Sequence, residues 1–339
     1  MDKQNEDLKK FFLKLFFFSL PFIAISSVYF AADPFKVLHK YDDYYVNCYI
    51  EPCRDYVSTE LYLKNRGTMH YDSFVFGSSR SKCFECRDWK KTDNDAVCFH
   101  FDASTENLYG IWAKVKLIDA QNDALRRALV ILDRETFKSV EDIPGHLFMK
   151  HPALSGRTPV SFHLAFFTAY FEKLFFVKFI DFSLFHHWHK YMGDVIYKEP
   201  IKNDPIFNDS EGGQPGTDQS DTEEYYIKMK DIFYPRDKVD HDSAEPVIDA
   251  KRIAMLKDMA AVFEKHHTRF KVIISPLYEQ IYFNKQDLKT LQDIFGQENV
   301  LDYSGVNEFT ADVHNYLETS HYKPKVAREI LRRIYSQAS

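Results

Sequence analysis

Two short stretches near opposite ends of the chain carry side chains that could perform acyl transfer. Residues 77–80 read GSSR and directly follow an apolar run. A turn at the glycine would lead serine hydroxyls into the start of a helix, where backbone N–H groups are free. Residues 318–321 read ETSH and precede Pro324, a residue favoured at the first position of a helix. A carboxylate that holds one imidazole nitrogen leaves the other nitrogen to take a proton from a serine.

Each stretch alone also fits a simpler explanation, because serines commonly cap helices and charged pairs are common in surface loops. Their places in the chain favour the catalytic interpretation, since one follows the first expected strand and the other precedes the last expected helix. The pattern predicts a serine of the turn at 77–81 as nucleophile, with His321 as its general base and Glu318 as the carboxylate that orients the base.

Apolar runs alternate with amphipathic segments over most of the chain beyond residue 70. The runs predict buried strands and the segments between them predict helices. The expected strands are 73–77, 96–101, 128–132, 270–275 and 299–302, and the expected helices are about 104–122, 249–267, 284–296 and 324–337. This alternation favours an α/β domain, a three-layer αβα sandwich around a parallel sheet. Ligands of such sheets bind beyond the carboxyl ends of the strands, where residues 77–80 lie.

Residues 71–80, together with the ETSH stretch, resemble the SGNH (GDSL-type) hydrolases. The chain is most similar to their membrane-anchored branch, which includes proteins of teichoic acid D-alanylation and alginate acetylation. The resemblance covers about residues 70–135 and 250–335, and it implies a flavodoxin-like sheet. It aligns Ser79 with the family's nucleophile and Ser78 with the Asp of Gly-Asp-Ser. Glu318 and His321 align with the family's acid and base, with Glu in place of Asp.

The chain departs from that family in the blocks that bind the oxyanion. No glycine stands in residues 101–105, and a backbone N–H at Ala103 or Ser104 would have to serve instead. The third-block asparagine is also absent, because Asp133 follows the third expected strand. Asn107 is the substitute donor that we expect. Each oxyanion donor typically contributes about 2.7–4 kcal/mol to lowering the barrier.

The resemblance implies acyl transfer through an acyl-enzyme on Ser79. Water as acceptor would make the protein an esterase, whereas a sugar hydroxyl would make it an O-acyltransferase. The chemistry requires no metal and no organic cofactor, and we expect neither. Arg80 is a candidate contact for an anionic polymer, and a salt bridge within the domain is the alternative. Expected partners are an acylated polysaccharide or other ester and a membrane protein that passes on the acyl group.

The N-terminus predicts a membrane anchor. Residues 15–32 contain no charge and follow Lys9, Lys10 and Lys14, so they are long enough to span a bilayer with the N-terminus inside. A cleaved signal peptide and a buried core helix are the alternatives. We expect residues 1–14 in the cytoplasm and residues 15–32 in the membrane. Residues 33–339 would then form the main domain, outside the cytoplasm in the periplasm or at the cell surface.

The strand and helix alternation is interrupted between about residues 134 and 248, which predicts a large helical and loop insertion. Residues 162–185 contain nine phenylalanines, and residues 204–224 read as a flexible polar loop. A second membrane crossing at 162–185 would separate Ser79 from His321. We therefore expect this stretch to pack on the domain or to lie on the membrane surface.

Composition and cysteine content exclude some functional classes. The net charge of −6 over 339 residues offers no basic surface for nucleic acid, so no nucleic-acid partner is expected. Five cysteines at 48, 53, 83, 86 and 98 leave at least one thiol unpaired. Cys83-x-x-Cys86 and the HHWH stretch at 186–189 suggest metal binding only weakly, because neither has matching ligands at typical spacing. The alternative function is a non-catalytic assembly protein of the envelope on the same fold.

Overall fold

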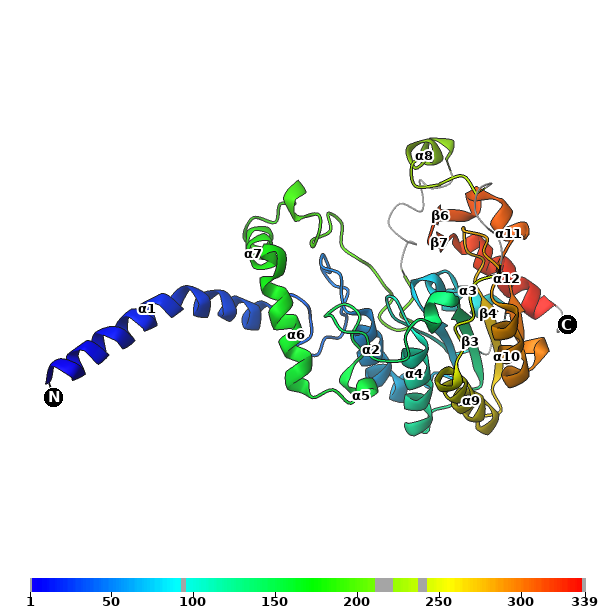
Figure 1. Ribbon diagram of the computed structural model, residues 1–339, viewed down its shortest axis with the longest axis horizontal. Coiled ribbons are helices and arrows are strands. Elements are labelled where there is room, and N and C mark those ends of the chain that lie inside the picture. The colour runs from blue at the N-terminus through cyan, green and yellow to red at the C-terminus, as the bar shows by residue number, and fades with distance from the viewer. Residues whose placement is uncertain (1, 93–95, 211–221, 237–242, 337–339) are drawn as a thin grey trace. The chain divides into compact units, whose positions relative to one another are not determined.

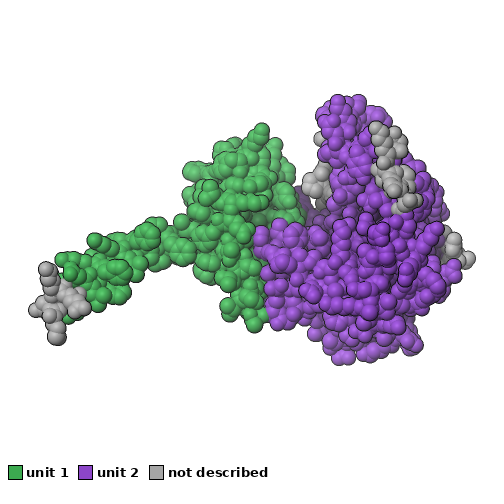
Figure 2. All heavy atoms as spheres, viewed as in Figure 1, with its two compact units in different colours: residues 1–52, 158–201 green, residues 53–157, 202–339 purple. Residues whose placement is uncertain are grey.

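The computed structural model describes residues 2–92, 96–210, 222–236 and 243–336 as a mixed α/β protein (Figure 1). The chain divides into two compact units, which Figure 2 shows in green and purple. Unit 1 contains residues 1–52 and 158–201, and unit 2 contains residues 53–157 and 202–339. Residues 33–52, and residues 158–201 of the expected insertion, therefore group with the N-terminal helix and not with the sheet.

Unit 2 is built on a five-stranded parallel sheet with the order β2-β1-β3-β4-β5. The strands are β1 (Ser73–Gly77), β2 (Cys98–Asp102), β3 (Arg127–Leu132), β4 (Arg269–Ile274) and β5 (Val300–Asp302). The first three are buried along their whole length, which explains why they read as continuous apolar runs. The prediction of a parallel α/β sheet is confirmed. The strand order reverses beside β1, so its carboxyl end lies where such sheets bind ligands.

Helices cover the sheet of unit 2, with α2 packed on β2, α4 on α9 and α12 on α3. They are α2 (Arg54–Met69), α3 (Cys86–Thr92), α4 (Leu108–Ala120), α5 (Pro152–Ser155), α8 (Glu223–Lys228), α9 (Ala250–Lys265), α10 (Lys285–Phe295), α11 (Glu308–Ala311) and α12 (Pro324–Ser336). Short 3₁₀ helices are η1 (Ser79–Cys83), η2 (Arg134–Phe137), η5 (Gln297–Asn299) and η6 (Val313–Asn315). In α12 the predicted apolar face is found, because Val326, Ile330 and Leu331 are buried in the core.

Unit 1 contains three long helices, α1 (Asp2–Ala32), α6 (Pro159–Phe171) and α7 (Phe175–Phe185), and the 3₁₀ helices η3 (Glu172–Leu174) and η4 (Lys190–Met192). By length and composition, the 5–32 part of α1 could cross a membrane, and the 159–185 stretch passes the same test. That second stretch is not one straight helix, however. Lys173 and Leu174 have φ values of 49° and 57° and interrupt it between α6 and α7.

The polar stretch expected as a flexible loop at 204–224 is ordered in its first part. Asn208 is fully buried and donates from Nδ2 to the carbonyl of His100 at 2.7 Å, while His100 donates its N–H to the carbonyl of Phe207 at 2.9 Å. Residues 204–210 therefore line the edge of β2, and for them the flexible-loop prediction is wrong. Residues 211–221 lie outside the described part of the chain, and α8 follows.

The cysteines form one disulfide, between Cys86 of α3 and Cys98 of β2. Cys48, Cys53 and Cys83 are buried and are not part of this disulfide. The Cys83 thiol donates to the carbonyl of Tyr322 at 2.8 Å, so Cys83 and Cys86 do not act as a pair. Within the described ranges no group of three or more His, Cys, Asp or Glu side chains is placed to hold a metal ion.

Candidate active site

Ser79 is positioned by the sharp turn at the end of β1. Gly77 has a φ of 155°, and a Cβ atom there would lie 2.8 Å from the carbonyl oxygen of Ile131 and 2.9 Å from Cβ of Ser81. Only glycine fits this close approach between the turn and β3. Helix η1 then begins at Ser79, and Ser78 caps it by accepting a hydrogen bond from the N–H of Arg80 at 3.4 Å. Ser79 itself is half-buried at the carboxyl edge of the sheet.

Glu318 and His321 lie opposite each other in a small antiparallel hairpin, formed by β6 (Tyr316–Glu318) and β7 (His321–Tyr322). The sequence predicted a loop here. Tyr316 and Tyr322, which pair at the base of the hairpin, are each only 1% exposed. The Tyr316 hydroxyl donates to the carbonyl of Pro276 at 3.0 Å, just beyond β4. The two buried rings thus fix the hairpin on the sheet and leave its tip at the surface.

The structure brings the three predicted side chains together. The Ser79 Oγ and His321 Nε2 atoms lie 2.7 Å apart. His321 Nδ1 is hydrogen-bonded to one carboxylate oxygen of Glu318, and the other oxygen accepts the N–H of Ser320 at 2.7 Å. Because Nδ1 donates to the carboxylate, Nε2 carries the lone pair that accepts the serine proton. The His321 and Glu318 side chains are 23% and 31% exposed, so an ester at the surface can reach them.

The surroundings of Glu318 favour its charged form. Burial alone would raise the pKa of this carboxyl group. The hydrogen bonds from His321 and from the N–H of Ser320 outweigh burial, and they hold the pKa of Glu318 below its usual value. A carboxylate that stays ionised next to His321 stabilises an imidazolium as it forms, which is what proton transfer from Ser79 requires.

Arg80 forms the salt bridge that was the alternative to substrate contact. Its Nη1 lies 2.6 Å from Oδ2 of Asp133, which follows β3, and its Nε donates to the carbonyl of Ser320 at 3.0 Å. Burial would lower the pKa of Arg80, but the charge of Asp133 outweighs it and raises the pKa. Arg80 therefore ties together the turn after β1, the end of β3 and the hairpin that carries the base. Its role beside Asp133 was not predicted from the sequence.

A second serine, histidine and aspartate arrangement lies beneath the nucleophile turn. The Ser81 hydroxyl donates to the carbonyl of Ser78 at 2.7 Å, and His100 Nε2 lies 3.0 Å from the same hydroxyl. His100 Nδ1 lies 3.4 Å from Oδ1 of Asp209. Because the Ser81 hydroxyl already donates its proton to the carbonyl of Ser78, its oxygen must accept a hydrogen bond from Nε2–H of His100. Ser81 and His100 are fully buried and Asp209 is 3% exposed, so this group supports the turn and does not meet substrate.

The loop after β2 offers fewer oxyanion donors than expected. The N–H of Ala103 donates to the carbonyl of Gly77 at 3.3 Å, so it is not available to a substrate. Asn107 caps α4 through its Oδ1 and donates from Nδ2 to the carbonyl of Glu141 at 2.8 Å. We therefore no longer assign the role of oxyanion donor to Ala103 or Asn107. Ser104 is half-buried, and within the part of the chain that the structure describes it forms no hydrogen bond.

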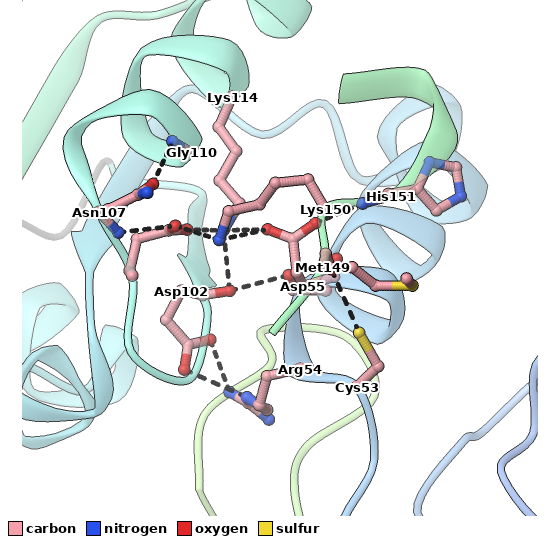
Figure 3. Close-up of polar contacts among 12 residues, drawn as sticks. Cys53, Arg54, Asp55, Asp102, Asn107, Gly110, Lys114, Met149, Lys150 and His151 are labelled. Atoms are coloured by element: carbon pink, nitrogen blue, oxygen red, sulfur yellow. Dashed lines mark hydrogen bonds and ion pairs between the residues drawn. The ribbon is translucent and has the colours of Figure 1, made fainter. Parts of the chain in front are cut away.

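A buried network of charges holds that loop in place (Figure 3). Glu106, in the loop, accepts hydrogen bonds from Lys114 of α4 and from Lys150, the latter at 2.5 Å. Asp55 of α2 lies 3.1 Å from Lys114 and 3.6 Å from Lys150. All four side chains are at most 1% exposed. Burial would raise the pKa of Asp55, but the two lysines outweigh it and lower the pKa. Two acids balance two bases, so the network is neutral in total.

A small cavity adjoins the salt bridge at the carboxyl ends of β3 and β4. Its volume is about 20 Å³, and it is lined by Asp133, Arg134, Ser275 and Glu279, among others. Measured as the space open to the centre of a water molecule, that volume has room for one water molecule, and Ser79, Glu318 and His321 are not among the residues that line it.

No protein-family model matches the chain, and no curated protein sequence matches it.

Proposed function

We propose that this protein is a membrane-anchored serine esterase or O-acyltransferase of the SGNH type. It acts outside the cytoplasm on acylated cell-envelope or exported polysaccharide. One observation carries the proposal: Ser79 Oγ lies 2.7 Å from His321 Nε2, and Glu318 holds Nδ1 of the same ring. The group lies at the carboxyl edge of a parallel sheet, beside the point where the strand order reverses. The proposal includes the three-layer αβα arrangement of that family.

The first half of the reaction forms an acyl-enzyme. The Ser79 oxygen attacks the ester carbonyl while His321 Nε2 takes the hydroxyl proton, and Glu318 stabilises the imidazolium. The backbone N–H groups of Ser79 and Ser104 bind the oxyanion in this scheme. As the tetrahedral intermediate collapses, the carbon–oxygen bond to the alcohol breaks and His321 returns the proton to the leaving alcohol.

The second half of the reaction releases the acyl group. A water molecule or a sugar hydroxyl gives its proton to His321 and attacks the acyl carbonyl, and Ser79 leaves with that proton. Water yields a free acid, whereas a sugar hydroxyl yields a new ester on the polysaccharide. In the transfer direction a membrane-bound donor protein supplies the acyl group. The reaction needs no metal or organic cofactor, because each proton is handled by His321.

Two features support a location outside the cytoplasm. Helix α1 is long and apolar enough to span a membrane, and the lysines before residue 15 favour an orientation with the N-terminus inside. The disulfide between Cys86 and Cys98 joins α3 to β2, and disulfides persist mainly in oxidising compartments. Both features favour a single crossing with unit 2 on the outer side.

The second candidate function is a non-catalytic assembly protein for envelope polysaccharide. The loop after β2 favours it, because Ala103 donates to Gly77 and Asn107 serves as a helix cap. A site with few oxyanion donors would hydrolyse esters slowly, since each donor typically lowers the barrier by about 2.7–4 kcal/mol.

Hydrolysis of an acetyl ester by the purified full chain tests the proposal. We expect turnover of p-nitrophenyl acetate, loss of turnover in Ser79→Ala, and retained turnover in Ser320→Ala, which changes a serine outside the triad. Added acetylated polysaccharide should compete with the small ester. Folded protein that hydrolyses neither substrate would favour the assembly function, as would equal residual rates in Ser79→Ala and the unmodified chain.

A further inference from the structure

A cavity opens at the amino ends of β3 and β4, at the edge of the sheet opposite to the triad. Its volume is about 320 Å³, which falls in the range of about 300–1,000 Å³ typical of ligand pockets. Parallel strands rise about 3.3 Å per residue, so the length of β3 separates this cavity from the carboxyl edge by roughly 20 Å. The triad side chains do not line it, so the two sites are distinct.

Three positively charged side chains line this cavity, which we call the basic cavity: Arg127, Arg269 and Lys271. Arg127 and Arg269 are register partners on β3 and β4, and Lys271 follows Arg269 by two residues. Because side chains alternate between the two faces of a sheet and neighbouring strands lie about 4.8 Å apart, the three belong to one face at close range. Among the described residues that line the cavity, none is acidic. Like charges repel at this range, so the cavity favours an anion.

Contacts within unit 2 hold these cations in place. The Arg127 side chain is 7% exposed, and its Nη1 lies 3.5 Å from Oδ2 of Asp72. Lys271 Nζ donates to the carbonyl of Glu298 at 2.8 Å and to Oδ1 of Asn299 at 3.1 Å. Both of these acceptors are neutral, and within the described residues they leave the third proton of the ammonium for a ligand. Cations that are already fixed reduce the cost of ordering the site on binding.

The amount of charge favours a phosphate monoester over other anions. Asp72 offsets one of the three positive charges, which leaves two. A carboxylate or a phosphodiester brings one negative charge, whereas a phosphate monoester brings about 1.5–2 near pH 7, together with three acceptor oxygens. The planar guanidinium groups of arginine also match phosphate oxygens in bidentate pairs. Charge and donor geometry therefore agree on this group.

The cavity continues from the cations to an apolar wall, which Ile334 and Tyr335 form at the end of α12. The Tyr335 hydroxyl accepts a hydrogen bond from Nε1 of Trp89 at 2.7 Å. Trp89 is fully buried, so this bond fixes the tyrosine ring beside the cavity. A wall of this kind offers contact to an organic group that is attached to the phosphate.

We infer that the basic cavity binds the phosphate monoester of a small organic molecule, about the size of a sugar phosphate. The phosphate lies between Arg127, Arg269 and Lys271, and the organic group lies against Ile334 and Tyr335. This inference goes beyond the proposed function and is independent of it, because the site needs neither an active triad nor an acyl group. It gives unit 2 a second ligand site, at the edge opposite to the triad.

Isothermal titration of the purified full chain in detergent at low salt, with glucose 1-phosphate as probe, tests this inference. We expect one saturable site. Arg269→Gln and Lys271→Gln should each weaken binding about tenfold or more, because each removes a hydrogen bond between charged groups. Arg269 is exposed and Lys271 is half-buried, so both variants should fold. Saturating probe should raise the Tm of the unmodified chain and should raise that of the two variants less.

Lys289→Gln is the matched control, because it removes the same charge outside the basic cavity. Lys289 lies on α10, is 72% exposed and is paired with Asp293 at 2.9 Å. This variant and Ser79→Ala should bind glucose 1-phosphate as the unmodified chain does. Gluconate, which has one carboxylate, and glycerophosphocholine, which is a phosphodiester, should bind at least tenfold more weakly. Inorganic phosphate should bind the same site with lower affinity, because it does not reach the apolar wall.

Folded protein that binds no glucose 1-phosphate would overturn the inference. Unchanged affinity in both Arg269→Gln and Lys271→Gln would place the probe elsewhere, and a loss in Ser79→Ala would place it at the triad. An equal loss in Lys289→Gln would show attraction by net charge and no defined site. Gluconate or glycerophosphocholine that binds as tightly would overturn the assignment to a phosphate monoester. Inorganic phosphate of equal affinity would overturn the role of the apolar wall.

Discussion

Replacing Arg80 by methionine tests whether its salt bridge positions the triad. The change keeps much of the side-chain length but removes the bond to Asp133 at 2.6 Å and the bond to the carbonyl of Ser320 at 3.0 Å. Asp133 is 3% exposed, and a hydrogen bond to a charged group contributes about 1.5–3 kcal/mol. Since Asp133 keeps the N–H bonds from Glu135 and Thr136, we expect a loss of stability in this range. A fully stranded buried charge would cost more, about 3–5 kcal/mol.

The effect of this change on the rate follows from the place of Ser320 between Glu318 and His321. Losing the bond to its carbonyl frees the tip of the hairpin, and a displacement of about 1 Å in a catalytic group can cost about 100-fold in rate. We expect kcat on p-nitrophenyl acetate to fall about 10- to 100-fold, with KM changed less. Asp133→Asn should give a similar fall. The double variant should be barely worse than either single variant, because both changes break one interaction.

Arg332→Met is the matched control for this experiment. Arg332 lies on α12 with its Nη2 2.7 Å from a carboxylate oxygen of Glu329, and the two side chains are 63% and 32% exposed. Exposed pairs contribute little to stability, so stability and kcat should change little. An Arg80→Met variant that is folded and has an unchanged kcat would refute the positioning role. Fully additive losses in the double variant with Asp133→Asn would show that the two residues act separately.

Three further changes test the charge on Glu318, the buried network and the disulfide. Glu318→Gln should lower kcat about ten-thousand-fold, because an amide favours the wrong tautomer of the base; equal rates for the two proteins would contradict the triad. The pKa of Glu318 in the folded protein lies below its usual value. The ionised Glu318 side chain therefore stabilises the fold fully above the ordinary glutamate pKa, and this stabilisation is lost as the pH falls through the lowered pKa. Urea unfolding of Glu318→Gln should accordingly depend less on acid pH than that of the unmodified chain. Lys150→Met leaves the buried network with one acid too many and should cost about 3–5 kcal/mol in urea unfolding, and a loss below 1 kcal/mol would argue against burial of those charges. Cys98→Ser removes the disulfide to Cys86, which lies 12 residues away. The change should lower the free energy of unfolding by about 3 kcal/mol under non-reducing conditions, and the difference in Tm between this variant and the unmodified chain should vanish when reductant is added.

The sheet and the three catalytic candidates could be predicted because they follow local patterns. Strands β1 and β3 are buried on both faces, so they read as apolar runs that end where ligands bind. Ser79 follows the first run, and Glu318 and His321 stand three residues apart before a helix. The hairpin that joins Glu318 to His321 was not predicted, because it is held by tertiary packing of two tyrosines and not by a turn motif.

The features that the sequence did not reveal depend on polar groups that are buried. Helix α2 has no apolar stripe to detect, because its buried residues include Arg54, Asp55, Ser58 and Glu60. Charged residues in such a stretch read as solvent-facing, whereas here they are paired with charges from other elements. Asn208 likewise sits in a stretch that reads as a loop, and it is buried by hydrogen bonds to the backbone of β2. In both places, residues distant in sequence determine that these polar side chains are buried.

Covalent labelling of the folded full-length protein with a fluorophosphonate probe, mapped by mass spectrometry of its peptides, tests the triad most directly. The probe reacts with a serine whose proton is taken by a neighbouring base. We expect one adduct, on Ser79, that disappears in Ser79→Ala and is strongly reduced in Glu318→Gln, while Ser320→Ala labels normally. Folded protein that takes up no probe, or that carries the adduct on another serine, would contradict the proposed nucleophile.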